Sequence, residues 1–259
     1  MADSKLKIDI RRNAILEALR RDGKVYVTQL SESLGVTPVT IRNDLDTLER
    51  DGYLIRMSGG AVYSNRSSEK AESSSNSAVS CQKEKEAIAK TISRMIKDGD
   101  TLFINSGTTT QFIATELKGL TNLNIVTNSL SVAMTLGGVA SFRVILLGGE
   151  INSQYAFTYG ADAQEKLSHY HADWAILAVD GIGAVNGITT HHAEEAVLDR
   201  MMINSAANVI IAADHTKIGR TGFLRVCDCS EGITLVTDNS EITSELKELT
   251  ASGINVVMA

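Results

Sequence analysis

The 259-residue sequence predicts two domains of different fold class: a small N-terminal domain, mainly helical with a β-hairpin, and a larger C-terminal α/β domain with a mainly parallel sheet. Residues 1–66 hold eleven of the 25 bases and nine of the 31 acids, which leaves 14 bases and 22 acids for the remainder. Net charges of +2 and −8 indicate two domains with different partners. Residues 64–80 are rich in serine and almost free of apolar side chains, as linkers are. We therefore expect domains at 1–63 and 81–259, joined by a linker at 64–80.

The composition is that of an ordinary globular protein. Hydrophobic residues make up 43% of the chain and the mean hydropathy is near zero, so a sizeable core can form. The first dozen residues are charged and no 18 consecutive apolar residues occur, so we expect neither secretion nor membrane insertion, and a cytoplasmic location. Three cysteines give no disulfide framework, Cys227 and Cys229 lack a second pair, and the histidines lack the helical spacing of metal ligands. We expect no metal and no cofactor.

The N-terminal domain begins with two helices and a short strand. Apolar residues fall on one face of a helix over about 9–21, and a β-type run follows at 25–27. Thr28 is placed to cap a second helix, which Gly35 ends.

The third helix is the most informative element of this domain. Thr37 is a good N-cap, Pro38 occupies the favoured first position, and Gly52 ends the run. Its apolar stripe consists of Ile41, Leu45 and Leu48. Its opposite face is small, polar and partly cationic, with Val39, Thr40, Asn43, Asp46, Thr47 and Arg50, and with Arg42 on the shoulder.

Two helices joined by the turn Gly35-Val36, the second with Thr, Arg and Asn near its start, match a helix-turn-helix that reads the DNA major groove. A solvated amphipathic helix is the alternative. The following segment, with strands at 53–57 and 61–63 and a glycine tip between them, predicts a β-hairpin placed as a wing. Arg56 and the tip are placed to lie along the DNA backbone or minor groove.

Residues 36–62, VTPVTIRNDLDTLERDGYLIRMSGGAV, resemble the winged helix of the DeoR-type family of bacterial sugar-metabolism regulators. The resemblance implies a winged helix-turn-helix in a DNA-binding transcription factor, usually a repressor, and no catalysis by this domain. The expected contacts with double-stranded operator DNA are Thr37, Val39, Thr40, Arg42, Asn43, Thr47, Arg56, Ser58 and Gly59.

The C-terminal domain alternates apolar strands with amphipathic helices, which favours a mainly parallel sheet flanked by helices. After a helix at about 82–97, the expected strands are 101–105, 123–127, 142–147, 174–179, 208–212, 233–236 and 254–258. The expected helices between them are 110–118, 130–136, 162–169, 192–207 and 240–251.

The segment SGTTT, residues 106–110, follows the first of these strands and opens a helix. Glycine lets the backbone approach a ligand, hydroxyls donate hydrogen bonds, and unpaired N–H groups at a helix N-terminus attract an anion. An ordinary capped turn is the alternative. Other strand ends add polar groups and glycines, and GITT at 187–190 predicts a further loop that leads into a helix. Because ligands bind parallel sheets at the carboxyl ends of strands, the set predicts a pocket for a phosphorylated sugar or polyol.

The motifs NSGTTT, GGE, the Asp180-Gly181-Ile182 turn, GITT with Glu194-Glu195-Ala196, and ADHTK resemble, in order and spacing, the effector domain of DeoR-type regulators. That domain is similar in fold to ribose-5-phosphate isomerase, glucosamine-6-phosphate deaminase and coenzyme A transferases, and it senses a phosphorylated sugar. The resemblance places phosphate on residues 106–110, positive charge on Lys85 and Lys217, and the sugar on Asp180, Asp214 and Glu194. The full set of expected effector contacts is Lys85, Ser106, Gly107, Thr108, Thr109, Thr110, Asn128, Gly149, Asp180, Glu194, Asp214 and Lys217.

Two positions depart from the family pattern. Ile151-Asn152 stands where the family often has Arg, and His191-His192 stands where Pro-Asn is usual. These departures leave the identity of the effector open.

Three functions are compatible with the sequence. The first is a repressor whose affinity for DNA falls when a sugar phosphate binds. The second is an isomerase, deaminase or transferase with a fused DNA-binding domain, which uses Glu194 or Glu195 as base or nucleophile and Lys217 as electrostatic stabiliser. The third is a DNA-binding and oligomerisation module with a vestigial pocket. Helix-turn-helix proteins commonly bind paired half-sites, so we expect a homo-oligomer, a dimer or tetramer.

Overall fold

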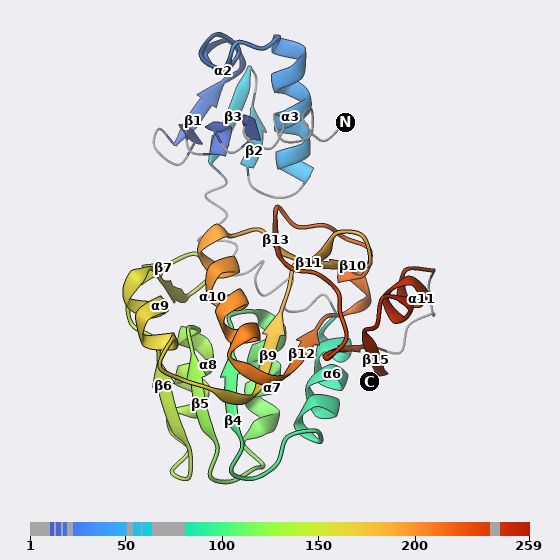
Figure 1. Cartoon of the computed structure of the whole chain (residues 1–259). Coiled ribbons are helices and arrows are strands. Elements are labelled where there is room, and N and C mark those ends of the chain that lie inside the picture. Colours follow the sequence, from blue (N-terminus) through green and yellow to red (C-terminus); the bar gives the residue numbers. More distant parts are fainter. Residues whose placement is uncertain are drawn as a thin grey trace. The chain divides into compact units, whose positions relative to one another are not determined.

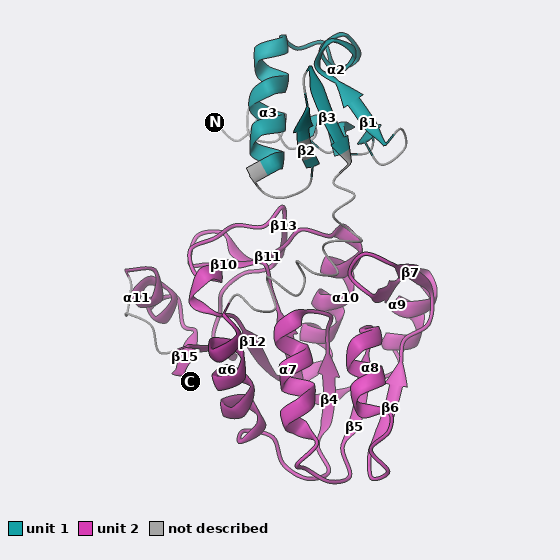
Figure 2. Cartoon of the chain, turned by 180° about the vertical axis from the view of Figure 1, so that it is seen from behind, with its two compact units in different colours: residues 1–77 teal, residues 78–259 magenta. Residues whose placement is uncertain are grey.

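The structure, a computed structural model, divides the chain into two compact units, which are described separately below: unit 1, residues 1–77, and unit 2, residues 78–259 (Figure 2). It describes residues 11–12, 14–16, 18–19, 23–50, 54–57, 59–63, 81–238 and 244–259. The linker expected at 64–80, the helix end expected at Gly52, and Ser58 lie outside the described residues.

Unit 1 has the helices and the hairpin that the sequence predicts. The described residues between 11 and 19 are helical. They are followed by β1 (Lys24–Tyr26), α2 (Val27–Leu34), α3 (Pro38–Arg50), β2 (Leu54–Met57) and β3 (Gly60–Tyr63). The strands form an antiparallel sheet in the order β1-β3-β2, and the apolar stripe of α3 is buried in a core with α2 and the sheet. The helix-turn-helix with a β-hairpin wing is therefore confirmed.

The capping of α2 differs from the prediction. The helix begins at Val27, one residue before Thr28, and Tyr26 occupies the N-cap position with extended backbone. Val27 is held there because its N–H donates to the carbonyl of Gly59 and its side chain is buried. Tertiary packing has thus moved the N-cap by two positions, from the predicted Thr28 to Tyr26.

An ion cluster joins the first helical residues to α3. Asp44 on α3 is 2% exposed, and its two oxygens accept from Arg11 Nε at 2.5 Å and from Arg12 Nε at 3.0 Å. Arg12 also donates to Thr47 Oγ1 at 3.3 Å. One buried carboxylate therefore fixes two arginines on the outside of the unit 1 core.

Unit 2 is a three-layer α/β structure (Figure 1). Its sheet contains β4 (Thr101–Ile104), β5 (Asn124–Thr127), β6 (Arg143–Leu146), β9 (Ala172–Ala178), β12 (Ala206–Ala212), β14 (Ile233–Thr237) and β15 (Asn255–Met258). The order is β15-β14-β12-β9-β4-β5-β6 and every pair is parallel, so all seven predicted strands and the parallel sheet are confirmed.

Helices cover both faces of the sheet. They are α6 (Gln82–Ser93), α7 (Thr108–Leu117), α8 (Leu130–Leu136), α9 (Ala161–Leu167), α10 (Ala193–Asn204) and α11 (Ser244–Ala251). The views from front and back show α9 and α10 on one face and α6, α7 and α8 on the other (Figures 1 and 2). Successive residues of a strand point to opposite faces of the sheet and so belong to different hydrophobic cores. In β9, Ile176 packs in the core on the α6–α8 side, whereas Ala175 and Leu177 pack in the core on the α9–α10 side.

The sequence did not predict the short antiparallel strands. β7 (Glu150–Asn152) pairs with β8 (Phe157–Tyr159), and β10 (Gly181–Gly183), β11 (Gly187–Thr190) and β13 (Leu224–Cys227) form a small sheet. The segment GITT, expected as a loop that opens a helix, is the buried central strand β11 of this sheet. These strands are too short to show a periodicity, and β11 pairs with β13 far along the chain.

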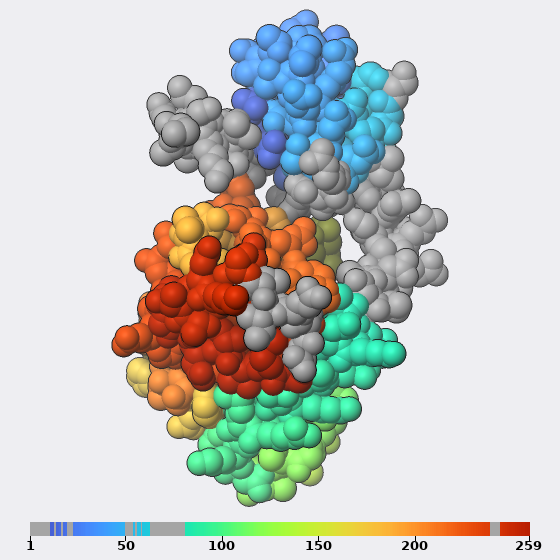
Figure 3. All heavy atoms as spheres, turned by 90° about the vertical axis from the view of Figure 1, so that its right-hand side faces the viewer, coloured from blue at the N-terminus to red at the C-terminus, as the bar shows by residue number. Residues whose placement is uncertain are grey.

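The strand order defines one special place in the sheet. From β4 the chain builds outwards through β5 to β6, then returns to β9 on the other side of β4 and builds outwards to β15. The C-terminal residues, with α11 and β15, finish this second edge on one surface of unit 2 (Figure 3, red). Such a reversal, here between β4 and β9, is where ligands commonly bind at the carboxyl ends of the strands of α/β sheets.

Removal of the buried carboxylate of Asp44 should loosen unit 1. We expect Asp44→Ala to lower the free energy of opening of α3 by about 2 kcal/mol, because two charged hydrogen bonds lose their acceptor. Hydrogen exchange of the full chain, read by mass spectrometry on peptides from residues 38–48, measures this change.

The matched control is Asp46→Ala on the same helix. Asp46 is 54% exposed and pairs with Arg56, so its loss should cost less than about 1 kcal/mol. Equal effects of the two substitutions would contradict the structural role assigned to Asp44.

Candidate functional site

The outer face of α3 presents the residues expected to contact DNA. Thr37 accepts from Thr40 N at 3.2 Å, and the two hydroxyls lie 2.9 Å apart, which confirms Thr37 as the N-cap. Arg42 and Asn43 are exposed, and Val39 is 61% exposed, an unusual value for a valine on a packed helix. Thr40 and Thr47 are half-buried. The helix start is therefore a small, accessible surface of hydroxyl, amide and guanidinium groups.

The wing is tied to α3 through Arg56. Arg56 Nη1 donates to Asp46 Oδ1 at 2.8 Å and to the carbonyl of Arg42 at 3.3 Å, and its backbone N–H donates to Glu49 at 2.7 Å. Gly59 is exposed in the hairpin turn. A DNA contact by Arg56 stays a prediction, and the geometry requires Arg56 to share its guanidinium with Asp46.

In unit 2 the expected anion site lies at the reversal between β4 and β9. Beyond the last paired residues of these strands, the side chain of Asn105 continues the pairing. Its Nδ2 donates to the carbonyl of Ala178 at 2.9 Å and its Oδ1 accepts from Ala178 N at 2.8 Å. The side chain of Asn105 thus takes the place of a backbone pairing with β9, directly before Ser106.

The segment that follows Asn105 is built as a cradle, defined here as Ser106–Thr110. Gly107 has φ +153°, and a Cβ there would stand 2.7 Å from the Cβ of Ala178, so only glycine fits. Gly107 precedes α7 and provides no side chain to cap the first N–H groups of that helix. Thr109 and Thr110 are buried, Thr110 donates to the carbonyl of Gly107 at 2.9 Å, and Thr108 is half-buried at the helix start.

A chain of hydrogen bonds connects the cradle to α10. Ser106 Oγ donates to Glu195 Oε1 at 2.5 Å, and Thr190 Oγ1 lies 3.0 Å from Glu195 Oε2 and 3.1 Å from Asp180 Oδ2. The N–H of His191 donates to Asp180 at 2.8 Å. Burial of Glu195, which is 8% exposed, raises its pKa to about 7 against the opposing hydrogen bond from Ser106. Ser106 and Asp180 are therefore connected through Glu195 and Thr190, which are not among the expected effector contacts.

A second buried carboxyl lies one helical turn further along α10. Asp199 is fully enclosed, its Oδ1 accepts from Asn105 Nδ2 at 3.1 Å, and burial together with the charge of Glu195 raises its pKa well above the usual range. Its Oδ2 has no hydrogen-bond partner among the described residues. A neutral Asp199 is the form that this enclosure favours.

The two expected cations lie with Asp214. Lys85 on α6 is buried, and burial lowers its pKa against the attraction of Asp214, while Lys217 acts on it as a like charge. Asp214 accepts from the N–H and the hydroxyl of Thr216. Lys85, Asp214 and Lys217 thus form one charged group in unit 2.

A further hydrogen-bonded pair, His215 with Asp238, was missed because nothing in the sequence singled out Asp238. His215 Nδ1 lies 2.9 Å from Asp238 Oδ2, and the N–H of His215 donates to the same carboxylate. Both residues follow strands of the large sheet.

The remaining expected residues, Asn128, Gly149 and Glu194, differ in burial and in their contacts. Asn128 is completely buried after β5, its Nδ2 donates weakly to Thr158 on β8 at 3.4 Å, and its Oδ1 has no partner among the described residues. Gly149 begins the β7–β8 hairpin and lies against the carbonyl of Tyr159. Glu194 is exposed, whereas its neighbour Glu195 makes the contact with Ser106.

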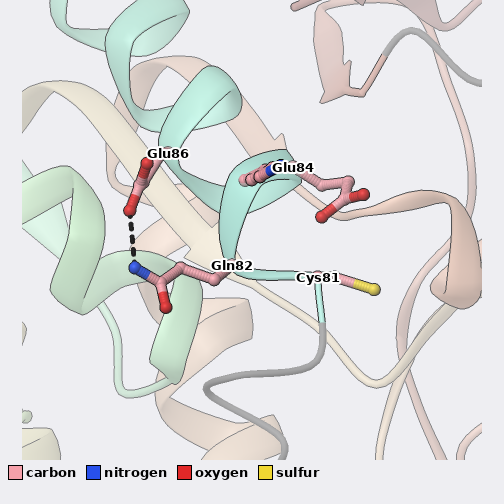
Figure 4. Close-up of a pocket in the computed structure, with 5 residues that line it drawn as sticks. Cys81, Gln82, Glu84 and Glu86 are labelled. Atoms are coloured by element: carbon pink, nitrogen blue, oxygen red, sulfur yellow. Dashed lines mark hydrogen bonds between the residues drawn. The ribbon is translucent and has the colours of Figure 1, made fainter.

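A shallow hollow lies at the start of α6, lined by Cys81, Gln82, Lys83, Glu84 and Glu86. Figure 4 shows Cys81 and Glu84 directed to one side and Gln82 and Glu86 to the other, where Gln82 donates to Glu86 at 2.8 Å. Its charged side chains are of mixed sign, so the hollow has no preference for an anion.

Comparison with protein families assigns both units. The model of the DeoR-like helix-turn-helix domain matches residues 11–67, and that of the DeoR C terminal sensor domain matches residues 80–239.

Whole-chain relatives are transcriptional repressors. The chain is 32% identical to the putative aga operon transcriptional repressor of Escherichia coli O157:H7, over 96% of this chain and 93% of that protein. It is 33% identical to the HTH-type transcriptional repressor GlcR of Bacillus subtilis, over 95% and 94%. It is also 33% identical to the glycerol-3-phosphate regulon repressor of Escherichia coli K12, over 95% and 97%.

Among solved structures, ribose 5-phosphate isomerase A of Methanocaldococcus jannaschii matches 53% of this chain and 54% of its own, with 15% identity and a TM-score of 0.40. Within the described residues, every helix is too short or too polar to cross a membrane.

The raised pKa of Glu195 predicts a pH dependence of stability. Below its ordinary value of 4.5 the carboxyl is protonated in both states, whereas between about 4.5 and 7 only the unfolded chain releases the proton. The contribution of Glu195 to stability is therefore lost as the pH rises from about 4.5 to 7, and is constant above that. We expect the melting temperature of Glu195→Gln to exceed that of the wild type by more at pH 7.5 than at pH 5, measured by calorimetry of the full chain. A constant difference across this range would show that Glu195 is not held neutral.

Proposed function

The chain belongs to the DeoR family of DNA-binding transcriptional regulators, and on that premise we propose that it represses a sugar or polyol catabolic operon and is released by a phosphorylated sugar or polyol. The observation that carries the proposal is the cradle at the N-terminus of α7, because it lies where parallel sheets bind ligands and offers backbone N–H groups and hydroxyls to an anion. Lys85 and Lys217 supply positive charge in the same unit. One relative is named for a glycerol-3-phosphate regulon, which supports a phosphate ester as the class of effector.

The DNA-binding part of the proposal assigns α3 to the major groove. Thr37 and Thr40 at its start donate to phosphate, and Arg42 and Asn43 reach base edges or phosphate. Val39 is exposed at the same end of the helix and contributes an apolar contact, for example with a thymine methyl group. Thr47, Arg56, Ser58 and Gly59 complete the proposed surface. We further propose that the protein acts as a homo-oligomer on paired half-sites.

The effector part of the proposal assigns phosphate to the cradle and the sugar to carboxylates. Asp180 is half-buried and Asp214 is buried, and both already accept hydrogen bonds from neighbouring residues. Glu194 is exposed on α10. Asn128 and Gly149 lie at neighbouring strand ends, and the buried Oδ1 of Asn128 has no hydrogen-bond partner among the residues that the structure describes. We assign both to the sugar side of the proposed site.

The experiment that tests the proposal is fluorescence anisotropy of the full chain on DNA from upstream of its own gene, at stated salt, with a panel of sugar and polyol phosphates. Tight binding that one ester releases, and that its free sugar does not, supports both parts. Tight binding that no ester changes contradicts the effector part. Absence of specific binding contradicts the repressor, and assay of the same esters as substrates then tests the enzyme alternative.

Removal of one guanidinium should separate the two functions. We expect Arg42→Ala to weaken operator binding by about tenfold or more, in line with the ~1–3 kcal/mol typical of a base or phosphate contact, and to leave effector binding unchanged. Anisotropy and calorimetry measure the two affinities. The matched control is Arg143→Ala, an exposed arginine on β6 of unit 2, which should change neither.

Removal of one hydroxyl in the cradle should have the opposite effect. Thr108→Val keeps the side-chain shape at the half-buried start of α7, so we expect unchanged DNA affinity. The ester concentration needed to release half of the DNA should rise about tenfold, because one hydrogen bond to the ester is lost. Thr115→Val, an exposed threonine later in α7, is the control. Loss of both functions in Thr108→Val, or an equal effect of the control, would contradict the assignment of the cradle.

A further inference from the structure

The hydroxyl of Ser106 is already in use. It donates to Glu195 Oε1 at 2.5 Å, and both residues are almost completely buried, with 6% of Ser106 and 8% of Glu195 exposed. An anion that accepts a hydrogen bond from this hydroxyl takes the donor away from Glu195. The protonation state of Glu195 then decides how much free energy this exchange costs.

The hydrogen bonds around Glu195 indicate whether its carboxyl is protonated. Thr190 has a single hydroxyl proton, yet its Oγ1 lies within 3.1 Å of carboxyl oxygens from both Glu195 and Asp180. The hydroxyl of Thr190 donates to only one of them. If Glu195 carries a proton on Oε2, it donates to Thr190 Oγ1, and Thr190 donates to Asp180. Every contact is then satisfied, whereas two ionised carboxylates leave one of them facing a lone pair.

The charges that act on Glu195 also favour the protonated form of its carboxyl. Asp180, which follows β9, and Glu194 on α10 both act on Glu195 as like charges. On the packed elements, Tyr159 of β8 donates to Glu150 and interacts electrostatically with Glu194, and Cys227 of β13 interacts electrostatically with Asp199. Arg200 of α10 donates to the carbonyl of Arg225. β11 and β12 carry no titratable side chain. The largest electrostatic contributions at Glu195 are negative, so an additional anion raises the pKa of its carboxyl further, as does the loss of the hydrogen bond from Ser106.

We propose that Glu195 is a positioning residue that couples anion binding in the cradle to the uptake of one proton. Ser106 transfers its hydrogen bond from Glu195 to the bound anion. In molecules whose Glu195 is still ionised, the carboxylate takes a proton from solvent and then donates a hydrogen bond to Thr190 Oγ1. The inference rests on the proposed function, since it concerns the same cradle. It adds that the site binds an anion together with a proton, and thus that the sensor responds to pH as well as to its effector.

The test is sulfate binding to the full chain by calorimetry at about pH 6 and about pH 8, at constant ionic strength. Sulfate stays a dianion across this range, so any proton exchanged belongs to the protein. With a free-state pKa of about 7 for Glu195, one linked proton makes wild-type binding about tenfold weaker at pH 8 than at pH 6. Titrations in buffers of different ionisation enthalpy should show close to one proton taken up per sulfate at pH 8.

The decisive variant is Glu195→Gln, whose amide keeps an acceptor for Ser106 and a donor for Thr190. It should bind sulfate at pH 8 about ten times more tightly than the wild type and with no pH dependence. Glu165→Gln, the same change at an exposed site on α9, should keep the wild-type profile. Wild-type binding that is equal at both pH values, or a pH dependence retained in Glu195→Gln, overturns the coupling and leaves the cradle intact. Absence of sulfate binding at pH 6 overturns the cradle and the proposed effector site with it.

Discussion

The candidate site of unit 2 depends on the parallel pairing of β4 with β9. These strands are far apart in the sequence, and they mark the place where the sheet changes its direction of growth. Asn105 extends their pairing by one step with its side chain, which forms two hydrogen bonds with the backbone of Ala178 in place of a strand residue. The backbone of residue 106 is thereby released from the sheet and turned towards α7.

The same amide group joins the cradle to the interior of α10. Asn105 Nδ2 also donates to Asp199, and Glu195 on the same helix accepts from Ser106. Two carboxyl groups one turn apart therefore support two consecutive residues of the β4–α7 segment. The arrangement places acids under a site that is expected to bind an anion, which is favourable only while those acids are neutral. Burial provides this condition, because it raises the pKa of both carboxyls.

Much of this architecture was readable from the sequence. The strands of the large sheet and the helix-turn-helix have strong periodicity, and glycine followed by hydroxyl residues after an apolar strand indicated the cradle. The predictions that failed concern short segments or positions that tertiary contacts decide. The short strands β7, β8, β10, β11 and β13 have no period to detect, and Tyr26 rather than Thr28 is the N-cap of α2 because Val27 is in contact with the hairpin.

The choice between adjacent glutamates was also beyond the sequence. Glu194 and Glu195 have the same chemistry, and only the rotation of α10 against the sheet exposes the first and buries the second. One signal was present: Asp199 stands four residues after Glu195 on a face that also carries Leu198 and Met202, and a carboxyl in such a face indicates a buried polar contact.

An enzyme built on the same pocket would make the opposite demand on Glu195. A general base must be ionised and must direct a free oxygen at the substrate. Here Oε1 accepts from Ser106 and Oε2 lies against Thr190, so both oxygens face protein groups. In its neutral form Glu195 has no basic function, but it releases Ser106 to an anion at little electrostatic cost. Catalysis by this carboxyl would increase as the pH rises through about 7, whereas proton-coupled sensing weakens over the same range. The direction of a single pH titration therefore distinguishes a sensor from an isomerase at this site.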